Sequence, residues 1–65
     1  MEEKLTVKQW RQLRGYTQKQ LADLAGMKFA TYHAKENGTR DWKANELMDV
    51  CKVLKVSIDT QVKYQ

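Results

Sequence analysis

Three glycines, Gly15, Gly26 and Gly38, divide the first 38 residues of this 65-residue chain into short stretches whose apolar residues recur with helical spacing. Glycine favours the left-handed backbone conformation in which many helices end. The chain contains no proline, and no stretch of useful length alternates polar with apolar residues as a half-buried strand does. The sequence therefore predicts one all-α domain over 1–65, a compact bundle of four to five short helices.

The first helix is expected over about 7–14. Thr6 precedes it and can accept a hydrogen bond from a free N–H group of the first turn. Val7, Trp10 and Leu13 follow at spacings of three residues, which puts them on one face. This helix should therefore bury one apolar side.

The second helix is expected over about 17–25, because Thr17 and Gln20 have the spacing of a capping box. Leu21 and Leu24 lie on one face of this segment and predict its buried side. Three further helices are expected at about 28–36, 44–55 and 58–63. The fullest core-facing pattern is in the fourth helix, through Leu47, Val50, Cys51 and Leu54.

Size and composition exclude several classes of protein. A single domain of this length has a stability margin of roughly 3 to 5 kcal/mol and no room for a large active-site cleft. His33 is the only histidine and Cys51 the only cysteine, which speaks against a metal site or a Cys–His nucleophile. We therefore expect no enzyme, no cofactor and no small-molecule ligand.

The unpaired cysteine indicates a reducing compartment. No stretch of the chain approaches the roughly 18 to 20 apolar residues that a membrane span needs, and the first residues lack the apolar run of a signal peptide. A cytoplasmic protein without membrane contact is expected.

The positive charge is concentrated in the middle of the chain. From Arg11 to Lys43 there are seven basic and three acidic residues, whereas the flanks hold five of each sign. The whole net charge of +4 therefore comes from this central segment. Such a segment is typical of a surface that binds a polyanion, although a merely solvated basic face is the alternative.

The second and third expected helices are separated by only a three-residue turn around Gly26. A turn of this length joins two helices at a steep angle. Ala22 fits that geometry, because a larger side chain there would collide with the third helix where the two cross. The pattern predicts a helix-turn-helix unit within the bundle.

The segments RQLRGYTQKQLADLAG and TYHAKENG resemble the phage repressor and Cro type of helix-turn-helix domain, and LMDVCKVLKVS is similar to that family's fourth helix. The resemblance covers roughly residues 5–62. It implies a lambda-repressor-like fold and a sequence-specific, double-stranded DNA-binding transcriptional regulator of phage or mobile-element origin. The family uses residues equivalent to 28–36 as its recognition helix in the major groove.

The resemblance also implies roles for individual residues. Base edges would be read by the outward positions Lys28, Phe29, Ala30, His33 and Ala34, while Met27 and Tyr32 turn inward with the tyrosine hydroxyl at the surface. Phosphates would be contacted by Gln18, Asn37, Thr39, Arg40 and Lys43. A structural ion pair would join Arg11 and Glu36.

The chain departs from the family pattern at three positions. Phe29 and Ala30 stand where members often carry side chains that hydrogen-bond to bases, so we expect these two to pack on thymine methyl groups. Lys35 stands where the family has an apolar residue. Its stem is expected to cross the core edge with the ammonium group free.

Repressors of this type bind two-fold operators, which implies a homodimer. We expect its contact in the C-terminal region, near Ile58, Val62 and Tyr64. A different class of function stays open, namely a protein-interaction module of the same fold. An antirepressor or antitoxin of this kind would bind a protein through the apolar face formed by Phe29, Ala30 and Ala34.

Overall fold

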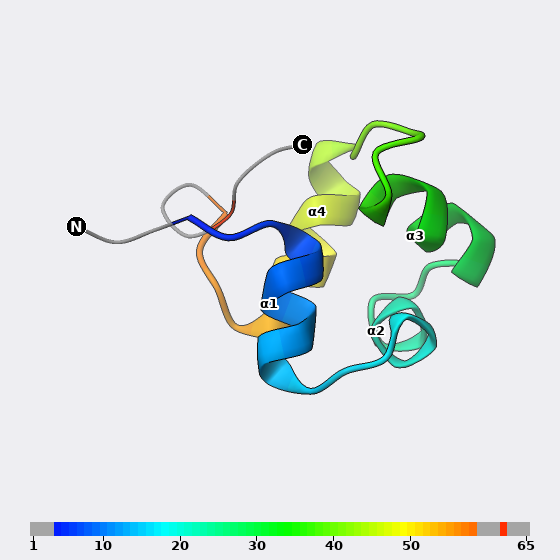
Figure 1. Ribbon diagram of the computed structural model, residues 1–65. Helices are drawn as coiled ribbons and strands as arrows, with labels where there is room; N and C mark the ends of the chain where they lie inside the picture. Colours follow the sequence, from blue (N-terminus) through cyan, green and yellow to red (C-terminus); the bar gives the residue numbers. More distant parts are fainter. Residues whose placement is uncertain (1–3, 59–61, 63–65) are drawn as a thin grey trace.

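The computed structural model describes residues 4–58 and residue 62, and the described residues form four helices (Figure 1). The order is α1 (Val7–Arg14), α2 (Gln18–Leu24), α3 (Phe29–Glu36) and α4 (Ala44–Leu54). The all-α fold expected from the sequence is confirmed. In the described part of the chain, no helix has the length and apolarity required to cross a membrane.

Local hydrogen bonds fix where α1 and α2 begin. The hydroxyl of Thr17 accepts from the Gln20 N–H at 3.0 Å, and the Gln20 side chain accepts in return from the Thr17 N–H at 2.9 Å. Thr6 and Gln9 form the same reciprocal pair ahead of α1. Each box satisfies two N–H groups at the start of a helix, where the backbone itself offers no partner.

The core lies where α2 packs on α3 and α4, and where α1 packs on α4. In Figure 1, α1, α2 and α3 are arranged around the longer α4. The buried apolar residues form one cluster drawn from all four helices and from Val62 after them: Val7, Trp10, Leu21, Ala22, Tyr32, Leu47, Val50, Cys51, Leu54 and Val62.

Two leucines expected in the core are largely exposed, so that expectation was wrong. Leu13 is 63% exposed and Leu24 is 59% exposed. Both belong to short helices that are covered along one narrow stripe only. In α2 this stripe is filled by Leu21 and Ala22, which are fully buried.

The fifth helix expected over 58–63 is not seen at either of its described positions. Ile58 lies in a turn, and Val62 forms an isolated parallel β-bridge with Leu5. Residues 59–61 and 63 lie outside the described part of the chain. Val62 is 2% exposed and belongs to the core. The expectation that Val62 forms part of a dimer surface was therefore wrong.

A buried ion pair links α3 to α4. Lys35 is 2% exposed, and its ammonium group donates to the carboxylate of Glu46. The expectation of a free ammonium group was thus wrong, because the stem leads the group into contact with a carboxylate at the edge of the core. The same carboxylate accepts from the Lys43 N–H at 3.0 Å, so it also holds the start of α4.

The tight packing of α4 gives a direct test of the core. Leu47 is 1% exposed, whereas its neighbour Met48 is 49% exposed. Leu47→Ala should lower the free energy of unfolding by about 3 kcal/mol, since it leaves a cavity, while Met48→Ala should cost less than about 1 kcal/mol. Urea unfolding followed by circular dichroism measures both. Equal losses for the two variants would contradict the assigned core.

Candidate nucleic-acid interface

The connection between α2 and α3 sets the direction of α3. Gly26 has a φ of 72°, in the left-handed region that favours glycine. The next residue, Met27, donates its N–H to the Ala22 carbonyl at 2.8 Å. Ala22 is fully buried, and its small side chain permits close packing of α2 and α3. One face of α3 is therefore packed on the protein, and the opposite face is left outside.

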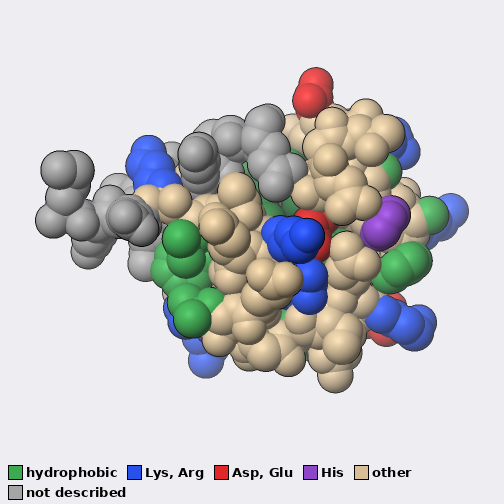
Figure 2. All heavy atoms as spheres, in the orientation of Figure 1, with side chains coloured by type: hydrophobic (Ala, Val, Ile, Leu, Met, Phe, Trp, Pro, Cys, Tyr) green, Lys and Arg blue, Asp and Glu red, His purple; other side chains and the backbone are tan. Residues whose placement is uncertain are grey.

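The structure leaves most of the expected base-reading residues exposed. Lys28, Phe29, Ala30 and His33 are exposed, with 47% exposure for Phe29, and Ala34 is half-buried. Figure 2 shows the histidine on the surface, with hydrophobic and basic side chains near it.

The inward face of α3 is formed by Tyr32, Lys35 and Glu36, all of which are buried. Tyr32 has no exposed surface, and its hydroxyl donates to Glu36. The expectation that this hydroxyl lies at the surface was wrong, because a buried carboxylate accepts its hydrogen bond. Tyr32 also packs edge-on against Trp42, with ring centroids 5.8 Å apart.

The ring nitrogens of His33 already have partners inside the protein. Nδ1 lies 3.3 Å from Oε1 of Gln18, and Nε2 lies 2.9 Å from Nδ2 of Asn37. The ring also stacks on Phe29 with centroids 5.7 Å apart. Sequence reasoning missed these contacts. The spacing of His33 and Asn37 at i and i+4 is the one local signal of them.

The loop after α3 is held against the end of the helix. The N–H groups of Thr39 and Arg40 both donate to the Ala34 carbonyl, at 2.9 and 3.2 Å. The four loop residues expected to contact phosphate are all exposed: Asn37, Thr39, Arg40 and Lys43. The loop with its two exposed basic side chains therefore lies at the C-terminal end of α3.

Glu36 is the centre of a buried polar cluster. Arg11 donates to both of its oxygens, through Nε at 3.0 Å and Nη2 at 3.1 Å. Gln18 donates through Nε2 at 3.0 Å, and Tyr32 donates its hydroxyl. A further nitrogen of Arg11 donates to the carbonyl of Tyr16 at 2.7 Å. The structure thus brings together the expected ion pair and Gln18, and it joins α1 to α2 and α3.

These contacts shift the pKa of Glu36 below its ordinary value. Burial acts to raise the pKa of this carboxyl, but hydrogen bonds from Arg11, Tyr32 and Gln18 outweigh it. The pKa of Glu46 is lowered in the same way, with burial opposed mainly by the hydrogen bond from Lys35. Burial raises the pKa of the Tyr32 hydroxyl, which stays protonated as a donor.

Comparison with known proteins identifies one family. A family profile described as helix-turn-helix matches residues 7–61. Neither the curated proteins nor the solved structures include a match to the chain.

The two lowered carboxyl pKa values predict loss of stability in acid. Both lie below the ordinary 4.5, so the ionised carboxylates stabilise the fold above that pH. Their contribution is lost as the pH falls through the lower folded-state values. The temperature of the thermal unfolding midpoint should therefore drop steeply once the pH falls below 4.5, the ordinary carboxyl pKa. Glu36→Gln should be less stable at neutral pH and lose less on acidification.

The exposed Asp41 provides the matched control. Asp41→Asn should keep the acid profile of the unmodified protein. An acid profile that Glu36→Gln leaves unchanged would contradict the role assigned to the buried carboxylate.

Proposed function

Because the chain belongs to the Cro and repressor type of the helix-turn-helix family, a family of DNA-binding transcription regulators, we propose that it binds specific double-stranded DNA sites with α3 in the major groove. It acts in this proposal as a regulator of the phage or mobile-element kind. The observation that carries the proposal is the exposed outer face of α3 together with the exposed loop at its C-terminal end, which bears Arg40 and Lys43. The major groove of B-DNA is wide enough for such a helix.

Base reading in this proposal is mainly apolar. Phe29 and Ala30 are exposed on the first turn of α3, and recognition helices contact bases through their N-terminal residues. Neither side chain can hydrogen-bond to a base edge, but both can pack on the methyl group of thymine. Lys28 adds a donor at the N-cap of the helix. We therefore infer sites in which thymine methyl groups supply much of the sequence preference.

Phosphate contacts hold the helix in place. Arg40, Lys43, Thr39 and Asn37 are the proposed side-chain contacts, since they are exposed next to α3. The side chain of Gln18 is bound to Glu36, so its contribution is proposed to come through the backbone N–H groups at the start of α2. These contacts fix the register of α3 on the duplex without reading its sequence.

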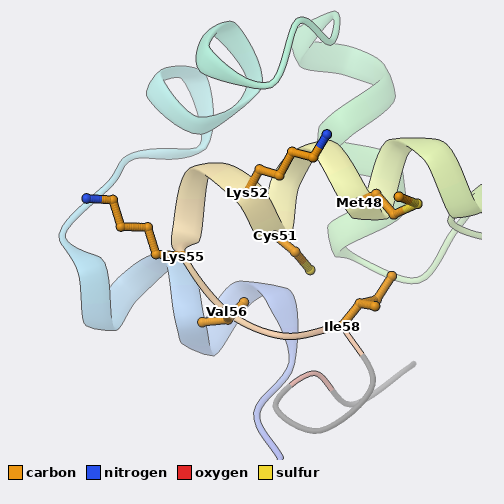
Figure 3. A pocket seen from close by; sticks show the side chains of 6 residues that line it. All are labelled: Met48, Cys51, Lys52, Lys55, Val56 and Ile58. Atoms are coloured by element: carbon orange, nitrogen blue, oxygen red, sulfur yellow. The ribbon is translucent and has the colours of Figure 1, made fainter.

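A two-fold site requires a second copy of the chain, and we propose that Ile58 contributes to the contact. Ile58 borders a pocket of about 250 Å³ between α4 and the segment that follows it, where Met48 is half exposed. Figure 3 shows Met48, Cys51, Val56 and Ile58 around this space, with the ammonium groups of Lys52 and Lys55 directed away from it. Tyr64, the other expected contact, lies outside the described residues.

A second function is favoured by the apolar character of the same face. Phe29 is nearly half exposed, with Ala30 next to it and Ala34 half-buried. A protein partner, as for an antirepressor or antitoxin, would cover these residues. The dependence of binding on salt separates the two functions, because only the neutralisation of several phosphates makes affinity fall steeply as salt rises.

Two substitutions should have opposite effects on DNA binding. Phe29→Ala should weaken the preference among sequences more than the overall affinity, because it removes an apolar base contact. Arg40→Ala should weaken binding to all duplexes about equally and reduce the slope of log affinity against log salt by about one. Binding selection on random duplex DNA at two salt concentrations measures both effects.

Lys8→Ala is the matched control, since it removes an exposed lysine from α1, outside both the proposed DNA surface and the pocket of Figure 3. It should leave both the preference and the salt slope nearly unchanged. Binding that is insensitive to salt, or an Arg40→Ala variant with unchanged affinity, would contradict the proposed function and favour a protein partner.

A further inference from the structure

A chain of hydrogen bonds leads from the buried Glu36 to the surface of α3. Gln18 donates through Nε2 to Glu36 at 3.0 Å, and its Oε1 lies 3.3 Å from Nδ1 of His33. The other nitrogen of His33 lies 2.9 Å from Nδ2 of Asn37. Glu36 is 1% exposed, whereas His33 and Asn37 are exposed. These hydrogen bonds therefore connect the interior of the protein to the face proposed to contact DNA.

Each side chain in this row of hydrogen bonds fixes the orientation of the next. A carboxylate only accepts hydrogen bonds, so Gln18 must direct its NH₂ group toward Glu36 and its oxygen toward His33. That oxygen also only accepts, so Nδ1 of His33 carries a hydrogen. In a neutral imidazole the other nitrogen is then an acceptor. Nε2 accepts from Asn37, whose NH₂ group consequently faces the ring.

We propose that His33 is a positioning residue, which sets the direction of the Asn37 amide and reverses it on taking up a proton. With His33 neutral, the NH₂ group of Asn37 is occupied and its oxygen is directed away from the ring. A proton from solvent adds to Nε2 and makes that nitrogen a donor. The Asn37 amide then turns its oxygen to the ring and its NH₂ group outward. The Nδ1–H bond to Gln18 is unchanged.

The reversal alters what the surface offers to a phosphate. An outward oxygen repels a phosphate oxygen, whereas an outward NH₂ group donates to it. The imidazolium adds one positive charge to the same face, and hydrogen bonds between charged groups are the stronger ones. Both changes strengthen binding to DNA as the pH falls. This consequence rests on the proposed function, while the proton arrangement itself does not.

The surroundings of His33 permit the change. Its neighbours are the Phe29 ring on α3, Asn37 at the C-cap of α3 and the neutral Gln18 amide on α2. Histidine changes its charge between about pH 5 and pH 8. Among the charged and titratable groups of the packed elements, Glu36 binds Arg11 and Tyr32, Lys35 pairs with Glu46, and Lys19 pairs with Asp23. Lys28 at the N-cap of α3 and Arg40 in the loop after it are exposed.

Nitrogen NMR of the free protein tests the proton arrangement without DNA. At about pH 8 the imidazole of His33 should be the Nδ1–H tautomer, and a hydrogen on Nε2 instead would overturn the proposal. On acidification the side-chain NH₂ resonances of Asn37 should shift together with the His33 ring. Those of the exposed Asn45 on α4 serve as the internal control and should not follow that titration.

DNA affinity at fixed ionic strength tests the consequence, with a labelled mixed-sequence duplex as the probe. Between about pH 8 and pH 5.5 the affinity of the unmodified protein should rise roughly tenfold. His33→Gln should remove the rise, and Asn37→Ala should retain only the part due to the imidazolium charge. Lys28→Gln, a matched control, should bind more weakly at every pH but keep the rise.

The outcomes separate this inference from the proposed function. Binding with a steep salt dependence but no rise in acid, or a rise that survives in His33→Gln, overturns the role of His33 and leaves DNA binding intact. Failure to bind DNA at any pH, with the Nδ1–H tautomer present, overturns DNA binding and supports the proton arrangement.

Discussion

The arrangement of the first three helices depends on the buried carboxylate of Glu36. It accepts hydrogen bonds from Arg11 on α1, from Gln18 on α2 and from Tyr32 on α3. Isolated in the interior, such a charge would be strongly unfavourable, so its cost is offset only while all these donors are in place. Glu36 therefore fixes the orientation of α3 relative to the elements on which it packs, and with it the direction of the exposed face.

Helix α3 serves two roles with only eight residues. Its inner side carries Tyr32, Lys35 and Glu36 into the core and into both buried ion pairs. Its outer side carries Phe29 and His33, which stack on each other in solvent. A helix held by charged pairs on one side can leave an apolar side uncovered without losing its position. This separation accounts for the apolar residues of α3 that the core does not absorb.

The sequence predicted those parts of the structure that depend on local interactions. The capping box of Thr17 and Gln20 is one example, because its members are three residues apart. Contacts between residues far apart in the sequence could not be predicted in this way. Lys35 on α3 pairs with Glu46 on α4, and His33 on α3 contacts Gln18 on α2. Leu13 and Leu24 show the limit of periodicity, since a regular apolar face does not specify how much of it a neighbour covers. The exposure of the α3 face follows from the packing of α2, which no single stretch encodes.

The central claim is that the exposed face of α3 and the loop after it bind duplex DNA. Titration of the protein with a duplex recovered by selection, followed by backbone amide NMR, tests it residue by residue. The account predicts shifts concentrated at 28–34 and 37–43, with little change at the exposed Lys8 on α1. Shifts centred on α1, or an unperturbed α3, would contradict it.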